Sequence, residues 1–244
     1  SGNRFGEAGS TVVIEEFMEG EEASLLAFVD GKTVVPMIAS QDHKRIFDGD
    51  NGPNTGGMGT YAPAPVLTDA LRDEAMKTIL EPMVGAMQKK GMPYVGCLYA
   101  GLMITSQGPK VVEFNARFGD PETQVVLPLL DSDLGQIMMA CATGTLTADM
   151  VKWKDSSAAC VILASKGYPE TSSKGDVIHG DIKQHDTTIV FHSGTKLIGD
   201  EYVTNGGRVL GVVGLGKDLR TALDRAYGRI EHIDFEGMQY RTDI

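Results

Sequence analysis

The amino-terminal part of the chain alternates between apolar, β-branched segments and polar turns. Residues 23–30 and 33–39 are rich in alanine, leucine and valine, and they flank a turn at Gly31. Two β-prone segments joined by a short glycine-containing turn predict a β-hairpin. Residues 11–17 are also β-rich, and we expect them to form a strand that precedes the hairpin.

A helical repeat follows the long, glycine-rich segment at residues 40–65. Apolar side chains recur every three or four positions from residue 71 to residue 87. Thr68 is placed to cap the amino terminus of this helix, and Gly91 is placed to end it. Pro82 lies inside the repeat and predicts a kink or a division into two helices, because proline lacks a backbone N–H.

The rest of the chain carries the patterns of further strands and helices. We predict strands at residues 94–104, 110–115, 158–164, 187–192 and 208–215, and helices at 123–130, 133–143 and 218–230. The polar segment 145–157 is a candidate linker because the composition shifts there. The predicted fold class is α+β. Residues 1–144 would form one unit, with a largely antiparallel sheet backed by the helix at 68–90, and residues 158–244 a smaller one.

Composition narrows the range of partners. The 244 residues carry a formal net charge of -11, which opposes binding of a nucleic acid or an anionic membrane by the surface as a whole. Any phosphate site must therefore be a local basic pocket. No apolar stretch approaches the roughly 20 residues needed to span a bilayer. The chain has three cysteines, Cys97, Cys141 and Cys160, and no two of them form a CxxC pair. Few, widely spaced cysteines are typical of a cytoplasmic protein with reduced thiols.

The predicted strand at 110–115 carries a pair of candidate metal ligands. Residues two apart on a strand share a face, so Glu113 and Asn115 present a carboxylate and an amide oxygen side by side, while Val112 and Phe114 point into the core. Such hard oxygen ligands suit Mg²⁺. Taken alone, the Glu-x-Asn pattern is more often that of an ordinary half-buried strand.

The loop after this strand adds charged groups. Arg117, Asp120 and Glu122 follow within seven positions of Asn115 in a turn-forming segment. A guanidinium beside a carboxylate-held metal is the counter-charge that a phosphoryl group or an acyl phosphate needs.

Two other segments carry candidate binding groups. Residues 14–23 place glutamates at the end of an apolar segment, where carboxylates can accept hydrogen bonds from adenine and ribose, although a solvated turn has the same pattern. Residues 40–45 and 51–59 combine His43, Lys44 and Arg45 with a glycine run that lets the backbone approach an anion closely. No Gly-Lys-Ser/Thr follows, so this is not a P-loop. A structural His43 and a mobile glycine loop are the alternatives.

Together these segments resemble the ATP-grasp enzymes and, within them, the phosphoribosylamine glycine ligases, also called glycinamide ribonucleotide synthetases. The Arg-Phe-Gly-Asp-Pro-Glu string at residues 117–122 is close to a signature of that family. Similar strings occur in the expected order at residues 2–8, 40–45, 52–59, 117–123, 175–180, 192–196 and 204–208.

The resemblance implies a role for each candidate residue. Glu113 and Asn115 become the ligands of a Mg²⁺ or Mn²⁺ ion that faces the triphosphate of ATP. Glu16, Phe17 and Met18 become the hinge that binds adenine, with Glu15 near the adenine amino group and Glu22 near the ribose hydroxyls. The implied catalytic residues are Lys44, Arg117 and Asp120. The implied contacts to glycine and 5-phosphoribosylamine are Asp42, Lys44, Arg45, Asn54, Thr55, Gly56, Gly57, Arg117 and Asp120.

The implied reaction is ATP-driven formation of glycyl phosphate, followed by attack of the amine of 5-phosphoribosylamine. Its products are glycinamide ribonucleotide, ADP and phosphate, in cytoplasmic purine biosynthesis. Complete family members carry an amino-terminal domain and a lid before the hinge, and only ten residues precede the hinge here. We therefore expect an inactive carboxy-terminal portion whose partner is the missing amino-terminal half. The alternatives are another ATP-grasp ligase and a non-catalytic module that binds a nucleotide or a protein.

Overall fold

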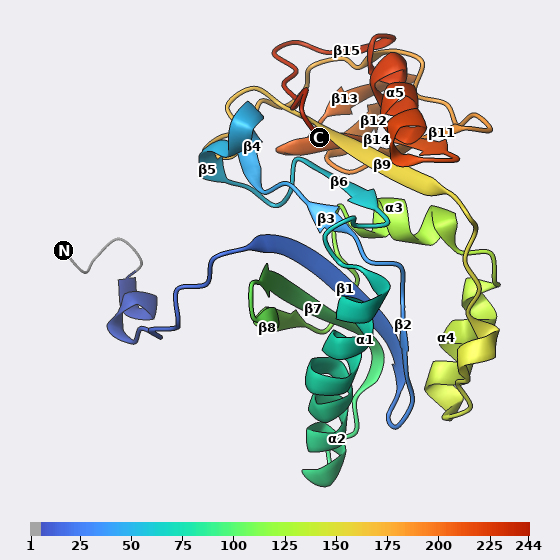
Figure 1. Ribbon diagram of the computed structural model, residues 1–244. Helices are drawn as coiled ribbons and strands as arrows, with labels where there is room; N and C mark the ends of the chain where they lie inside the picture. The colour runs from blue at the N-terminus through green and yellow to red at the C-terminus, as the bar shows by residue number, and fades with distance from the viewer. Residues whose placement is uncertain (1–5) are drawn as a thin grey trace.

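The computed structural model describes residues 6–244, and residues 2–5 of the amino-terminal string lie outside the described range. Two antiparallel sheets dominate the molecule. The four-stranded sheet has the order β2-β1-β7-β8, and the five-stranded sheet has the order β11-β14-β9-β6-β3. Figure 1 shows the five-stranded sheet above the four-stranded one. Every strand pair in the described range is antiparallel, so the predicted α+β class is confirmed.

The four-stranded sheet is built from two hairpins. Its strands are β1 (Glu21–Asp30), β2 (Val34–Pro36), β7 (Val95–Thr105) and β8 (Gly108–Asn115). The predicted hairpin at Gly31 is confirmed, with a φ of 98° that glycine adopts without a steric penalty. The long pairing of β1 with β7 joins the two hairpins into one sheet.

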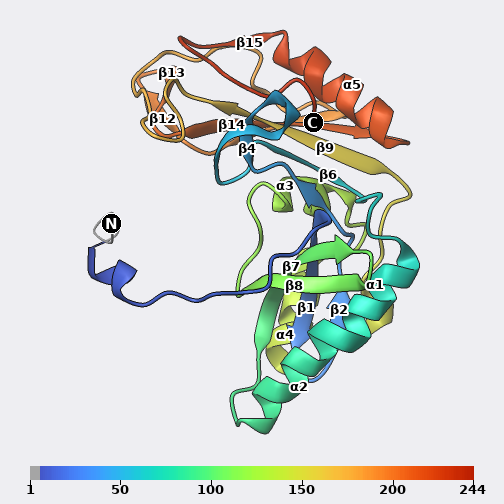
Figure 2. The same cartoon turned by 60° about the vertical axis from the view of Figure 1, so that its left-hand side comes forward.

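Helices cover both faces of this sheet. Leu26 and Phe28 of β1 pack toward α4 (Leu134–Thr143), whereas Leu25 and Ala27 pack toward α1 (Asp69–Ala75) and α2 (Glu81–Lys89). Burial on both faces explains the continuous apolar run of β1. Figure 2 shows α1 and α2 lying across the sheet.

The predicted helix at residues 68–90 is present and divided. Thr68 caps α1 by accepting a hydrogen bond from the backbone N–H of Leu71 at 3.4 Å. A π-helical turn (Met76–Leu80) separates α1 from α2, and Pro82 lies in the first turn of α2. Proline at this position removes a helical donor, so the widened turn lies where the sequence predicts an interruption.

The five-stranded sheet joins early and late parts of the chain. It takes β3 (Gln41–Asp42) and β6 (Gly59–Ala62) from the first part, and β9 (Ser157–Ala164), β11 (Thr188–His192) and β14 (Arg208–Gly216) from the second. The helix α5 (Leu219–Ile230) packs on β14 and β9. The division into 1–144, 145–157 and 158–244 stays a prediction, and this sheet crosses it.

The remaining elements are short. They are β4 (Arg45–Phe47), β5 (Asn51–Asn54), α3 (Thr123–Val126), β10 (His179–Gly180), β12 (Thr195–Ile198), β13 (Glu201–Thr204), β15 (Ile233–Asp234), and 3₁₀ turns at Gly6–Ser10, Asp48–Asp50, Leu127–Leu129 and Ala148–Met150. Within residues 6–244, none of the helices has the length and apolar character that crossing a membrane requires.

The predicted strand at residues 11–17 is wrong. These residues form no strand, and Figures 1 and 2 show them running away from the body of the molecule. Val13, Ile14 and Phe17 are 82%, 91% and 87% exposed. A strand needs a partner to satisfy its backbone groups, and in the described part of the chain this segment pairs with none. Its β propensity alone does not make a strand.

Candidate functional site

The end of β8 places the two predicted metal ligands together. The side-chain amide of Asn115 donates a hydrogen bond to Oε1 of Glu113 at 2.9 Å, so both side chains lie on one face of the strand. The predicted core residues need a correction. A bulge opposite Gly101 leaves Val112 without a partner, and Val111 rather than Val112 packs against the core beside Phe114. The extra residue changes which side chains of β8 face the core on the amino-terminal side of Glu113.

Two oxygen ligands alone do not complete a metal site. Within residues 6–244 no cluster of three or more histidine, cysteine or acidic side chains is arranged to hold an ion. The pair of Glu113 and Asn115 still fits Mg²⁺, which needs only one or two protein oxygens and takes the rest from water and phosphate. Rotating the Asn115 amide by half a turn would present its oxygen beside the Glu113 carboxylate.

The loop that follows β8 turns its charged groups in different directions. Arg117 is exposed and donates to the backbone oxygen of Phe118 at 2.9 Å. Oδ1 of Asp120 accepts from the side chain of Gln124 at 2.8 Å, and Oδ2 accepts from Arg208 at 3.1 Å. The loop therefore contributes one positive group, Arg117, and one negative group, Asp120, next to the predicted metal ligands.

A cavity of about 180 Å³ gathers half of the predicted site residues. Its wall comes from β8 and the loop after it, from the segment around β3, and from the glycine-rich loop. The predicted residues that line it are Asp42, Lys44, Thr55, Gly56, Glu113, Asn115, Arg117 and Asp120. Segments that are distant in sequence thus converge on one small polar space.

The floor of this cavity contains a buried network that the sequence analysis missed. The Tyr99 hydroxyl donates to Oε1 of Glu122 at 2.8 Å, and the Ser24 hydroxyl donates to the same oxygen at 3.1 Å. Glu122 is only 4% exposed. Burial, with the charge of Glu122, raises the pKa of Tyr99, so its hydroxyl stays protonated and remains a donor. The family-like string contains Glu122, but nothing local in sequence pairs it with Tyr99.

Asp42 carries an unpartnered buried oxygen at this site. Its Oδ1 atom is buried and has no hydrogen-bond partner. Burial and the nearby Glu122 raise the pKa of this carboxyl well above its usual range, and Lys44 and Arg208 only partly oppose the increase. A buried polar atom without a partner is rare and costly in native proteins, so a donor from a bound molecule is the natural complement.

A second cavity of about 430 Å³ lies next to the first and shares Asp42 and Lys44 with it. Glu22, Arg45 and Asn54 also line this space. Lys44 forms an ion pair with Glu22 across it. Burial alone would lower the pKa of Lys44, but Glu22, together with Asp42 and Glu113, outweighs burial and raises it, so the ammonium stays charged.

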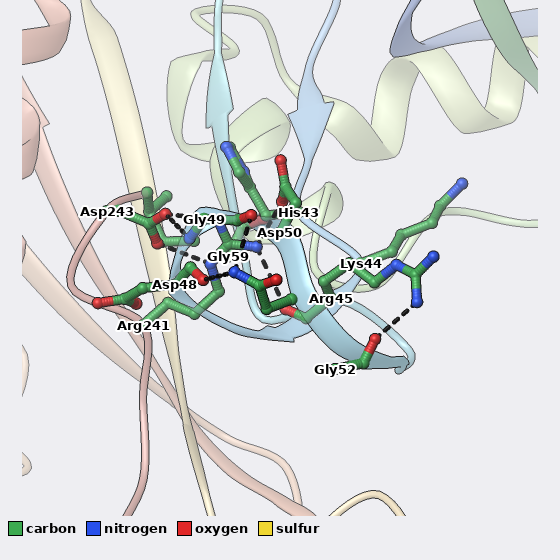
Figure 3. Close-up of polar contacts among 12 residues, drawn as sticks. His43, Lys44, Arg45, Asp48, Gly49, Asp50, Gly52, Gly59, Arg241 and Asp243 are labelled. Carbon is green, nitrogen blue, oxygen red and sulfur yellow. Dashed lines mark hydrogen bonds and ion pairs between the residues drawn. The ribbon is translucent and has the colours of Figure 1, made fainter.

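A buried arginine braces the wall of the larger cavity. Arg241 is 1% exposed and donates to Asp50 at 2.7 Å, to Asp243 at 2.7 and 2.8 Å, and to the backbone oxygen of Arg45 at 3.2 Å. Figure 3 shows Arg241 and Asp243 on one side of the hairpin formed by β4 and β5, and the side chains of Lys44 and Arg45 extending on the other side. Arg241 therefore supports the segment that carries Lys44 and Arg45 from the side opposite to their side chains.

His43 has a structural environment. Its Nδ1 lies 3.3 Å from the backbone oxygen of Gly59, and its ring packs on Tyr61 with centroids 5.4 Å apart. Burial, with the charge of Arg241, lowers the pKa of this imidazole, so it is neutral at neutral pH. The structural alternative for His43 therefore has direct support, although the residue also lines the larger cavity.

The glycine-rich loop lies close to the acidic side chains. A Cβ atom on Gly57 would come within 2.4 Å of Pro121 and 2.6 Å of the Asp42 carboxylate, and the φ of 112° is strained for other residues. Gly57 itself is buried and does not line either cavity. Its role is therefore to let the loop approach Asp42.

The predicted adenine hinge is only partly connected to this site. Glu15, Glu16 and Phe17 are exposed and Met18 is half-buried, and none of the four lines either cavity. One contact fastens the segment to the sheet, an ion pair of 2.7 Å between Glu16 and Lys110 of β8. Glu22, by contrast, reaches the larger cavity.

Comparison with known proteins places both parts of the chain. A model of the phosphoribosylglycinamide synthetase ATP-grasp (A) domain matches residues 1–123, and a model of the phosphoribosylglycinamide synthetase C domain matches residues 158–244. The phosphoribosylamine–glycine ligase of Caulobacter vibrioides is 55% identical over all of this chain and 58% of its own length. A trifunctional purine biosynthetic protein of Gallus gallus is 52% identical over 98% of this chain and 24% of its own length.

Solved structures agree with the sequence relatives. The phosphoribosylamine–glycine ligase of Thermotoga maritima matches 94% of this chain and 57% of its own with a TM-score of 0.83 and 35% identity. The biotin carboxylase domain of 2-oxoglutarate carboxylase from Hydrogenobacter thermophilus, solved with ADP and magnesium, matches 93% of this chain and 48% of its own with a TM-score of 0.68 and 14% identity. The second match, at this identity, shows a shared fold only.

Proposed function

The chain belongs to the phosphoribosylglycinamide synthetase family, and we propose that it supplies the metal- and substrate-binding part of a phosphoribosylamine–glycine ligase. The chain spans about 58% of the length of several of the relatives it matches. The proposed reaction joins glycine to 5-phosphoribosylamine, consumes ATP, and releases glycinamide ribonucleotide, ADP and phosphate. Its place is cytoplasmic purine biosynthesis, and the free thiols of the three buried cysteines agree with a reducing compartment.

The observation that carries this proposal is the convergence of charge on the smaller cavity. Glu113 and Asn115 stand beside Lys44 and Arg117, and Asp42 and Asp120 complete the wall. Metal ligands beside fixed cations suit a phosphoryl transfer, where catalysis is mostly positioning and charge neutralisation. No protein nucleophile is required. The donor set fits Mg²⁺, which would neutralise charge on the triphosphate when bound, and Mn²⁺ takes the same oxygen ligands.

In the first step of the proposed reaction, a carboxylate oxygen of glycine attacks the γ-phosphorus of ATP and ADP leaves. The cations of Lys44 and Arg117 are positioned to stabilise negative charge on the transferred group. Lys44 stays charged because three carboxylates surround it. The ion pair with Glu22 holds the Lys44 ammonium where the two cavities meet.

In the second step, the amine of 5-phosphoribosylamine attacks the carbonyl carbon of glycyl phosphate. The C–N bond forms as the C–O bond to phosphate breaks, and the proton that the amine loses ends on the released phosphate. Asp42, whose buried Oδ1 has no partner, is placed to accept a hydrogen bond from an amino group of either substrate. Arg45, Asn54, Thr55 and Gly56, which line the two cavities, would hold the rest of the two substrates.

A coupled assay of ADP release tests the proposal. The gene product that carries these residues should release ADP only when ATP, Mg²⁺, glycine and 5-phosphoribosylamine are all present. Replacing glycine by alanine or β-alanine is the matched control, and release should fall to the background rate. ATP binding without any release under these conditions would favour a non-catalytic module instead.

A further inference from the structure

One arginine of the late part of the chain reaches into the site. Arg208 is the first residue of β14, and its guanidinium donates to the backbone oxygen of Gly56 at 2.7 Å and to that of Asp120 at 2.8 Å. It also donates to Oδ2 of Asp120 at 3.1 Å and lies 3.5 Å from the backbone oxygen of Gly57. A single side chain therefore contacts two of the loops that wall the smaller cavity.

A second side chain from the same part of the molecule holds the same loop. The backbone N–H of Gly56 donates to the hydroxyl of Tyr168 at 3.0 Å. Tyr168 in turn packs against Gly207, where a Cβ atom would come within 2.2 Å of its ring. Gly56 is thus held through its carbonyl by Arg208 and through its N–H by Tyr168.

The contact of Arg208 with the loop is close-fitting. A Cβ atom on Gly56 would lie 3.0 Å from the Arg208 guanidinium, which is tighter than most contacts in proteins. Arginine suits this position because its rigid fork presents five donors and can serve several acceptors at once, whereas lysine offers a single point charge. A loop with glycines at positions 56 and 57 has large conformational freedom, and Arg208 restrains it in addition to the backbone contact of Thr55 with Lys44.

We propose that Arg208 is a positioning residue that fixes the Gly56–Gly57 loop and the Asp120 carboxylate relative to each other. This inference rests on the proposed function, because it assigns the brace to the walls that would face glycine and 5-phosphoribosylamine. The carboxy-terminal part of the chain would then set the geometry of the substrate site without touching a substrate. Glu22 and the hinge lie on other segments, so ATP binding should not depend on the brace.

Hydrogen exchange tests the brace without any assumption about the reaction. In an Arg208→Ala variant, the backbone amides of Thr55, Gly56 and Gly57 should exchange about tenfold faster than in the wild type, because loss of charge-assisted hydrogen bonds makes local opening easier. Arg220→Ala is the matched control. Arg220 lies in the same part of the chain, is 86% exposed and pairs with Asp224 on α5. Unchanged exchange in residues 55–57 of the Arg208→Ala variant would overturn the proposal.

Steady-state kinetics test the consequence for the reaction. Arg208→Lys, which keeps the charge and is the safer variant for folding, should raise the KM for glycine and for 5-phosphoribosylamine by about tenfold and leave the KM for ATP within about twofold. Guanidinium ions at millimolar concentration should partly restore activity to Arg208→Ala but not to Arg208→Lys. An equal increase in all three KM values, or none, would overturn the assignment. Absence of activity in the wild type would instead sink the proposed function, and the exchange result would still decide the brace.

Discussion

The side-chain amide of Asn115 lies 2.9 Å from Oε1 of Glu113, at the carboxyl end of β8 and at the edge of the smaller cavity. This contact makes the two residues a single polar unit rather than two independent surface groups. Both residues line the same cavity as Lys44 and Arg117.

Removing Glu113 should weaken metal use. We predict that Glu113→Ala raises the Mg²⁺ concentration for half-maximal activity by at least about tenfold and removes most of the turnover, because a bound metal contributes several kcal/mol of charge stabilisation. Titration of activity with Mg²⁺ measures the effect. Glu81→Ala, a change at an exposed glutamate at the start of α2, should leave the titration curve unchanged. Identical curves for Glu113→Ala and the wild type would reject Glu113 as a ligand.

Asp42 should cost stability at neutral pH. The folded chain holds the pKa of this carboxyl above 3.8, the value expected in the unfolded chain, so the charged form is disfavoured by folding. Asp42→Asn should therefore raise the melting temperature at pH 7, at about 2–4 °C for each kcal/mol gained. The gain should shrink as the pH falls and disappear below 3.8, where the wild-type carboxyl is protonated in both states. Activity should fall in the same variant.

Melting curves of the wild type and Asp42→Asn between pH 4 and pH 8 measure this dependence. Asp149→Asn is the control, because this carboxyl is on the surface and a hydrogen bond from the Thr147 side chain lowers its pKa instead. A gain in stability that is independent of pH would contradict the assignment to the Asp42 charge.

Arg241 should be a major contributor to stability. Its guanidinium is buried and donates to Asp50, Asp243 and the backbone of Arg45. Arg241→Met keeps much of the volume but removes every donor, and we expect a loss of about 2–4 kcal/mol in the free energy of unfolding. Urea denaturation measures it. A loss below about 0.5 kcal/mol would show that the network adds little beyond a surface ion pair.

ATP should bind weakly to a chain of these 244 residues alone. Phe17 of the proposed hinge is 87% exposed, and Glu15 and Glu16 beside it are exposed too, so contacts of adenine with this segment would remain in water. Electrostatic contacts are worth far less there than in an enclosed site. Calorimetry should give a dissociation constant for Mg-ATP near or above about 1 mM. Micromolar binding would show that the segment folds over the nucleotide unaided.

Sequence patterns place candidate residues correctly when they lie on the same strand. Alternation places Glu113 and Asn115 on one face, and the structure agrees. The bulge at Val112 cannot be read from the pattern, because Val111 and Val112 are both valines and either could face the core. Local patterns also locate the hairpin at Gly31 and the divided helix at Pro82, since turn and helix signals depend on a few adjacent residues.

Contacts between distant segments are what the sequence analysis could not supply. The strand expected at residues 11–17 fails because pairing, not propensity, makes a strand. Tyr99 and Arg208 join the site only through the fold, the first through Glu122 and the second through Gly56 and Asp120. Arg208 lies in the family-like string at residues 204–208, but nothing in that string links it to Gly56 or Asp120, and Tyr99 carries no such signal.

The most direct test of the ligase proposal follows an oxygen atom. With glycine labelled with ¹⁸O in its carboxylate, attack on the γ-phosphorus of ATP places one labelled oxygen on the phosphate, and attack by the amine then releases it. The gene product that carries these residues should yield one ¹⁸O per phosphate, in step with glycinamide ribonucleotide, as measured by mass spectrometry of the phosphate. Release of unlabelled phosphate during amide formation would contradict the proposal that glycine is activated as an acyl phosphate.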